Sequence, residues 1–233
     1  EYQWAVDDQW DVVAGISYDW RDSLEGMKHE KDGSITHYDS NNQNAFNWQA
    51  MTKYHFDNRD DIALSVSDRS RFPTLKERYT TSRPAFGQVA LVNPNLKAER
   101  ARSIDLTYTG YLSEDWGYEA SVYYNRISDA ILTQNIDANT VQNRNSGRVD
   151  YTGLDLGVNG LILNEVKVGL SYSLIHSDVK DKDVGKVTGL PTQTVMGWVT
   201  YTPWQPLSLT LSEEARSSSY SNSDGSQKAG GFA

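Results

Sequence analysis

The feature that most constrains the fold of this chain is an alternation of apolar and polar residues with a period of two. In its first clear stretch, Val12, Ile16 and Trp20 are separated by small or polar residues, among them Ser17 and Asp19. Successive side chains of a β-strand point to opposite faces, so the pattern predicts strands with one apolar face and an all-β, antiparallel architecture. The stretches with this pattern, about ten in all, lie at 2–6, 12–21, 46–56, 62–67, 103–112, 118–125, 154–162, 166–174, 195–201 and 207–214.

The hydropathy of the sequence excludes a helical membrane protein but is compatible with a transmembrane β-barrel. Only 38% of the 233 residues are hydrophobic and the mean hydropathy is −0.63, although the chain has 7 Trp and 14 Tyr. No run approaches the roughly 18 apolar residues that a membrane-spanning helix needs. The strands of a transmembrane barrel alternate lipid-facing and lumen-facing residues, so their average hydropathy resembles that of a soluble protein.

The connections between the predicted strands alternate in length. Short turns lie at 7–9, 57–60, 113–115, 163–165 and 203–206, and long polar segments lie near 24–43, 70–100, 133–146, 178–193 and 216–228. Outer-membrane barrels show this alternation, with short periplasmic turns and longer extracellular loops, whereas a soluble sandwich has no reason to keep it. We therefore predict that residues 1–233 form one domain, a transmembrane β-barrel segment. An open sheet edge in lipid would leave backbone groups unsatisfied, so these strands must be continued by others. We therefore expect residues 1–233 to be a part of a barrel that is incomplete at both ends.

Aromatic residues border the predicted turns repeatedly. Core packing or strand propensity could explain any one of them. Their recurrence at strand ends favours the aromatic girdles that mark the two membrane interfaces. The residues assigned to these girdles are Trp10, Trp20, Trp116, Tyr118, Tyr201 and Trp204.

Two segments around the second long connection resemble the paired sequence boxes of the TonB-dependent receptor family. Residues 71–79 (RFPTLKERY) are similar to its aromatic-x-Pro-x-Leu-x-Glu-x-Tyr box, and residues 93–100 (NPNLKAER) to the companion box. Residues 123–131 and 153–156 are similar to later strands of the family, in the family's order. The resemblance implies a barrel of about 22 strands with a plugged lumen, in the outer membrane of a Gram-negative bacterium. It also implies that the plug domain, the TonB-binding region and further strands lie outside residues 1–233.

The resemblance places the ligand-binding residues on the long loop between the two boxes. We expect contacts from loop side chains that can bind a ligand by charge, stacking or hydrogen bonds: Arg71, Tyr79, Arg83, Phe86 and Gln88. We expect the box residues themselves to shape the loop, because proline forbids strand pairing and asparagine favours turns. This structural set comprises Phe72, Pro73, Asn93, Pro94, Asn95 and Leu96.

The sequence contains no recognisable catalytic or cofactor site. Its four histidines are scattered and match no metalloprotease or nucleophile–base pattern, so we predict that the chain is not an enzyme and holds no cofactor. Heme receptors of the resembled family carry a histidine between the two boxes. This chain has no histidine between Phe72 and Asn93, which makes heme a less favoured cargo, although His29 or His37 could still act as a ligand.

Charged residues point to neither a metal site nor a nucleic-acid partner. Asp178, Asp181 and Asp183 precede Gly185, but the run lacks the Glu that completes an EF-hand loop, so we expect solvated charges and predict no metal site. The net charge is −9 and no basic stripe is present to neutralise phosphates, which argues against binding nucleic acid.

The predicted function is that of an outer-membrane active-transport receptor, surrounded by outer-membrane lipid, that imports a scarce ligand with energy from TonB. A ferric siderophore is the favoured cargo, because such complexes are often anionic and arginine and aromatic side chains bind them by charge and stacking. Cobalamin, heme and glycans remain alternative cargoes. A passive porin is the second class considered, since it shares the strand pattern but lacks the paired boxes, and an outer-membrane enzyme is the third.

Overall fold

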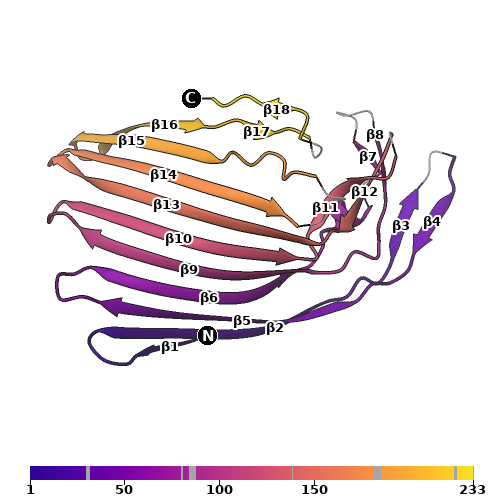
Figure 1. The fold of residues 1–233 in the computed structure, drawn as a ribbon, viewed down its shortest axis with the longest axis horizontal. Helices are drawn as coiled ribbons and strands as arrows, with labels where there is room; N and C mark the ends of the chain where they lie inside the picture. Colours follow the sequence, from indigo (N-terminus) through magenta and orange to yellow (C-terminus); the bar gives the residue numbers. More distant parts are fainter. Residues whose placement is uncertain are drawn as a thin grey trace.

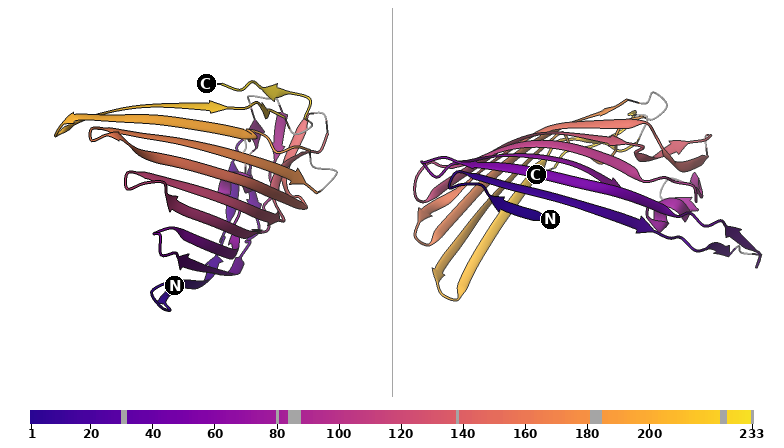
Figure 2. Two further views of the ribbon diagram at one scale, coloured as in Figure 1. Left: turned by 60° about the vertical axis from the view of Figure 1, so that its left-hand side comes forward. Right: turned by 90° about the horizontal axis from the view of Figure 1, so that it is seen from below.

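A computed structural model describes residues 1–29, 32–79, 81–83, 88–137, 139–180, 185–222 and 225–232. Its main element is a ten-stranded antiparallel sheet whose strands follow one another in chain order, which confirms the predicted all-β fold. The sheet curves into an open arch, as Figures 1 and 2 show. Its strands are β1 (Tyr2–Ala5), β2 (Trp10–Arg21), β5 (Gln43–His55), β6 (Asp61–Arg71), β9 (Glu99–Tyr111), β10 (Trp116–Ser128), β13 (Arg148–Leu163), β14 (Val166–Val179), β15 (Gln193–Trp204) and β16 (Leu207–Arg216).

The arch has a short-turn end and a long-loop end. The tight connections gather on the left of Figure 1 and the long ones on the right, as the alternating lengths predict. The structure adds small sheets and one helical turn to connections that the sequence analysis treated only as polar segments. These elements are β3 (Gly26–His29), β4 (Ile35–Tyr38), α1 (Leu75–Tyr79), β7 (Ser82–Arg83), β8 (Gln88–Leu91), β11 (Ile131–Asn135), β12 (Thr140–Asn145), β17 (Ser219–Tyr220) and β18 (Lys228–Ala229).

Two of the long loops are joined in one sheet. Strands β7 and β8 belong to the loop between β6 and β9, whereas β11 and β12 belong to the loop between β10 and β13. The four strands pair in the order β11-β12-β8-β7, and the two loops are joined within this sheet by the parallel pairing of β12 with β8. The two loops therefore form a single unit at the long-loop end.

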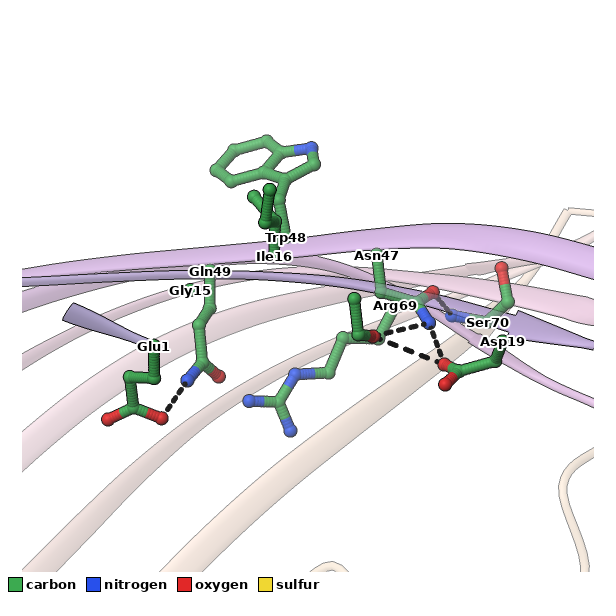
Figure 3. Close-up of a pocket in the computed structure, with 10 residues that line it drawn as sticks. Glu1, Gly15, Ile16, Asp19, Asn47, Trp48, Gln49, Arg69 and Ser70 are labelled. Atoms are coloured by element: carbon green, nitrogen blue, oxygen red, sulfur yellow. Dashed lines mark hydrogen bonds between the residues drawn. The ribbon is translucent and has the colours of Figure 1, made fainter.

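The two faces of the large sheet differ in polarity. Figure 3 shows Ile16 and Trp48 on one side of the sheet, and Asn47, Gln49 and Arg69 on the other. We call the first the apolar face and the second the polar face, which is on the hollow side of the arch. Ile16 is 73% exposed in the chain as it stands. A continuous apolar surface of this kind requires an apolar environment.

An aromatic ladder crosses the sheet near the short-turn end. Ring centroids lie 4.8 Å apart for Trp10 and Tyr54, 4.9 Å for Tyr54 and Phe56, and 6.0 Å both for Phe56 and Tyr108 and for Tyr108 and Tyr118. Such contacts add to the burial of each ring. The ladder contains Trp10 and Tyr118, which the sequence analysis assigned to a girdle.

Aromatic rings also cover glycines on neighbouring strands. A Cβ atom built on any of four glycines would lie 2.2–2.5 Å from a ring atom of the adjacent strand, or from its hydroxyl. Aromatic cover of a glycine is a known device for fixing the register of a sheet. The pairs are Tyr118 over Gly110, Tyr123 over Gly153, Trp116 over Gly160 and Trp198 over Gly169.

A nearly buried aspartate anchors the ladder at the turn between β5 and β6. Asp60 accepts a hydrogen bond from the Tyr108 hydroxyl at 2.6 Å and one from the Tyr111 backbone N–H at 3.2 Å. The Tyr108 hydrogen bond holds the pKa of Asp60 below its usual value of 3.8, although burial acts in the opposite direction. Because the folded-state pKa is lowered, the stabilisation is present above pH 3.8 and is lost as the pH falls further.

We expect Asp60→Asn to lower the melting temperature of the detergent-solubilised receptor by about 2–4 °C at pH 7 and to flatten its decline below pH 3.8. Melting curves recorded between pH 7 and pH 3 would measure both effects. Asp57→Asn, at the same turn, is the control, and an equal loss in the two variants would contradict the role given to Asp60.

Among the described residues, no helix has the length and hydropathy needed to cross a bilayer.

Candidate functional site

The first sequence box folds into a capped helical turn at the base of the long loops. The Thr74 backbone N–H donates to Glu77 Oε2 at 2.7 Å, and the Glu77 N–H donates to Thr74 Oγ1 at 3.2 Å. This reciprocal arrangement is a capping box, which satisfies backbone donors that a helix start leaves free. It explains why α1 begins at Leu75, directly after Thr74.

Arg71 links this helical turn to β9 and, through Glu99, to β11. We call the region where β6, α1, β9 and β11 meet the junction. Its guanidinium contacts the Glu77 carboxylate through Nη1 at 2.9 Å and Nη2 at 3.0 Å, and Glu99 through Nε at 2.6 Å. The second oxygen of Glu99 accepts a hydrogen bond from the Ile131 N–H at 2.5 Å. Arg71 and Glu99 thereby connect β6, α1, β9 and β11. Burial raises the pKa of Glu77, but bonds from Arg71 and Thr74 outweigh it and lower the pKa.

The second box connects the same junction to its neighbours. Asn93 donates through Nδ2 to the Asn143 carbonyl at 2.9 Å, which ties it to β12. The Pro94 and Leu96 carbonyls accept hydrogen bonds from side chains at the start of β5, namely from Asn41, just before the strand, at 2.7 Å and from Gln43, its first residue, at 2.6 Å. Asn95 is exposed, whereas Pro73 and Leu96 are among the most deeply buried side chains. The Pro73 carbonyl accepts a hydrogen bond from Arg21.

Arg78 and Tyr79 lie inside this junction. Arg78 is fully buried, and none of its guanidinium nitrogens has a hydrogen-bond partner in the part of the chain that the structure describes. Burial lowers the pKa of Arg78, and the nearby charge of Arg21 lowers it further. The Tyr79 ring lies 5.4 Å from the Tyr38 ring, and its hydroxyl faces the Gly26 backbone.

The structure describes the side chains of only part of the predicted ligand-binding set. Arg71 lies in the ion pairs of the junction, and Tyr79 packs beside Tyr38. Arg83 and Gln88 lie on β7 and β8, but their side chains lie outside what the structure describes. Phe86 lies outside the described residues altogether.

A polar hollow lies on the polar face, near the long-loop end (Figure 3). Its volume is about 350 Å³. Asn47 organises its wall, since the side-chain amide donates to Asp19 and to Ser17 Oγ at 3.3 Å, and its oxygen accepts the Ser70 N–H at 2.7 Å. These contacts fix polar groups from β2, β5 and β6 around one space.

Arg69 is a cation that lines this hollow. Its side chain extends beneath the sheet toward the hollow in Figure 3. It makes no hydrogen bond or ion pair with any residue that the structure describes. A guanidinium group with unused donors can bind carboxylate or other anionic oxygen groups through paired hydrogen bonds. The sequence analysis did not select Arg69, although period two places it on the same strand face as Arg71.

Comparison with known proteins gives a family and a set of structural neighbours. The family model described as "TonB dependent receptor-like, beta-barrel" matches residues 1–233. Three solved structures are similar at 16% identity, each over 99% of this chain: the copper transporter OprC, with a TM-score of 0.74, and two further receptors with a TM-score of 0.72. These are the ferric-catecholate import receptor Fiu from E. coli K12, in its closed form, and the ferric yersiniabactin uptake receptor FyuA from Yersinia pestis.

The chain spans 37% of the OprC chain and 35% of each of the other two. At this level of identity the likeness shows a shared fold. The search of curated proteins found no significant match.

Proposed function

Because the chain belongs to the TonB-dependent receptor β-barrel family, we propose that it is part of a receptor that takes up a scarce ligand with energy from TonB. The family is one of transport receptors of the Gram-negative outer membrane and not of enzymes. In such a barrel the apolar face contacts lipid and the polar face lines the interior. The short-turn end is then periplasmic and the long-loop end extracellular.

The proposed cargo is a ferric siderophore. The observation that carries the proposal is the Arg69 guanidinium, which has no partner among the described residues, in a polar hollow of the interior face below the extracellular loops. Ferric siderophore complexes often carry anionic oxygen groups, which suit a guanidinium. The names of two structural neighbours, a ferric-catecholate receptor and a ferric yersiniabactin receptor, support the same class. Arg71, Tyr79, Arg83, Phe86 and Gln88 remain proposed loop contacts for the ligand.

Copper is a second candidate cargo, favoured by one feature of the β3–β4 hairpin. Met27 and His37 stand directly opposite each other in the register of that hairpin, and both are exposed. His37 contacts Glu25 through Nδ1 at 2.7 Å, and its Nε2 makes no hydrogen bond with a described residue. Thioether and imidazole groups suit copper. The sequence analysis predicted no metal site and named His37 only as a possible ligand for heme.

Uptake by living cells tests the proposed function. Cells carrying the full-length gene, with and without working TonB, would be given radiolabelled iron bound to a panel of siderophores, and separately copper. We expect accumulation of at least one ferric siderophore that disappears without TonB. Uptake that is indifferent to TonB would instead indicate a passive channel. TonB-dependent uptake of copper alone would replace iron as the cargo.

We expect Arg69→Gln to weaken siderophore binding about tenfold, because it removes a charge-assisted contact. Binding to the purified full-length receptor would be measured by fluorescence quenching. Lys167→Gln removes one positive charge from the same face at its periplasmic end and serves as the control. Equal affinities in the two variants would rule out Arg69 as a ligand contact.

A further inference from the structure

The lipid-facing side of the barrel carries a row of charged residues at its extracellular end. In the register of the sheet, Asp68 pairs with Arg102, Arg102 with Arg126, and Arg126 with Asp150, on β6, β9, β10 and β13. Directly opposed residues of antiparallel strands point to the same face. Ile104 lies two residues along β9 from Arg102 and belongs to the apolar face, so these charges stand on that face just beyond the apolar band.

The centre of the row places two positive charges side by side. Arg102 and Arg126 are direct cross-strand partners, and like charges in that position repel each other. Their ion pairs are with the outer members of the row. Arg102 Nε lies 3.1 Å from Asp68 Oδ2, and Arg126 Nε lies 3.3 Å from Asp150 Oδ1. No carboxylate stands between the two guanidinium groups in the register.

The carboxylates of the row are shared with two further arginines. Arg100 Nε contacts Asp68 at 2.5 Å, and Arg148 Nη2 contacts Asp150 at 3.1 Å. Four guanidinium groups therefore face two carboxylates, so this patch is net positive on a chain whose net charge is −9. A further acid–base pair at the end of β14 adds no net charge: Asp178 and Lys180.

The central arginines keep hydrogen-bond donors available. The Arg102 side chain is 64% exposed, and its single contact with a described residue is made by Nε. Arg126 uses Nε and Nη2, which donate to the Tyr124 hydroxyl at 3.1 Å and 2.7 Å, and leaves Nη1 free among the described residues. The pair thus offers to the lipid-headgroup region at least three N–H-bearing nitrogens that no described residue uses: two of Arg102 and one of Arg126.

We propose that Arg102 and Arg126, supported by Arg100 and Arg148, bind a phosphate group of a phosphorylated glycolipid in the outer leaflet. A phosphate between the two guanidinium groups would offset their repulsion and accept their free donors. The site lies on the face that contacts lipid, immediately above the apolar band, so a membrane lipid can hold its acyl chains against that band while its phosphate meets the arginines. Charge complementarity and position together select this occupant.

The test uses the full-length receptor purified in detergent and freed of lipid. The probe is an acylated disaccharide carrying two phosphates, compared with the same lipid after removal of both. We expect the phosphorylated lipid to raise the melting temperature of the wild-type receptor, and Arg102→Gln with Arg126→Gln to weaken its apparent affinity at least about tenfold. Each carboxylate keeps one arginine in this double variant, so the fold should persist. Arg59→Gln, at a periplasmic turn, is the charge-matched control for one substitution and should behave as wild type.

Three outcomes would overturn the proposal. One is equal stabilisation by the phosphorylated and dephosphorylated lipids, and another is equal affinity of the double variant and the wild type. The third is full protection by inorganic phosphate alone, which would show a site for soluble anions and not for a lipid. If the double variant fails to fold, Arg102→Gln alone provides the same comparison. Ligand uptake by these variants reports separately on the proposed transport function.

Discussion

Replacing Glu99 with alanine should loosen the extracellular loops while leaving the barrel strands folded. The Glu99 side chain is only 13% exposed and joins the Arg71 guanidinium to the Ile131 backbone N–H. Its removal leaves one donor of Arg71 and a partly buried N–H without their partners, a cost of about 2–4 kcal/mol to the junction. Hydrogen exchange of the β11 amides, followed by mass spectrometry, should become at least about tenfold faster.

A matched substitution separates this local effect from a general one. Glu114→Ala removes the same side chain from an exposed position in a short periplasmic turn and should leave β11 exchange unchanged. Unaltered exchange in the Glu99 variant would show that β8 and β12 hold the loops without the ion pairs. Faster exchange throughout the barrel strands would show instead that Glu99 supports the whole sheet.

The joined loops have a consequence for ligand binding. Arg83 and Gln88 lie on β7 and β8, which are paired through β12 to a loop that begins after β10. A displacement of either loop must therefore be followed by the other. If the cargo is the proposed ferric siderophore, we expect Glu99→Ala to weaken its binding even where neither Glu99 nor Arg71 touches the ligand, because the loops would lose their fixed shape.

The large sheet could be predicted because period two determines both the strand and its orientation. A slip of one residue would move every side chain to the opposite face. The apolar side chains, such as Ile16 and Trp48, can therefore face lipid in only one register of the strands. The same alternation continues from Ile104 back to Arg102 and from Tyr124 on to Arg126, which are two residues away on the same face. The sequence analysis stopped at the apolar residues and so missed that row.

The loop sheets could not be predicted in this way. Strands β8 and β12 are short, lack alternation, and pair although about fifty residues separate them along the chain. The sequence also identifies Arg71 as a cation without showing that Glu77 and Glu99 occupy its donors. Such partners depend on how distant segments meet in space, whereas a box pattern records only which residue types are present.

Among glycine-to-alanine substitutions at the described glycines of β13, Gly160→Ala should destabilise the barrel most. A Cβ atom at Gly160 would lie 2.3 Å from Trp116 Cδ2, 2.7 Å from Trp116 Cγ and 2.8 Å from the Asp115 carbonyl oxygen. The carbonyl belongs to the backbone and the ring atoms are close to the Trp116 Cα, so neither can move without shifting β10. We expect a loss of about 1–3 kcal/mol and a smaller folded fraction in the outer membrane.

The same strand supplies the control for this prediction. A Cβ atom at Gly157 would meet nothing within 4 Å, so Gly157→Ala changes the backbone entropy of the unfolded chain equally but adds no collision. Thermal unfolding in detergent should therefore show a lower melting temperature for Gly160→Ala and an unchanged or slightly higher one for Gly157→Ala. Trp116→Leu combined with Gly160→Ala should recover part of the loss, since the smaller side chain makes room for the methyl group. Equal melting temperatures for the two alanine variants would mean that the ring of Trp116 leaves Gly160 at little cost, and that its cover does not fix the register of β10 against β13.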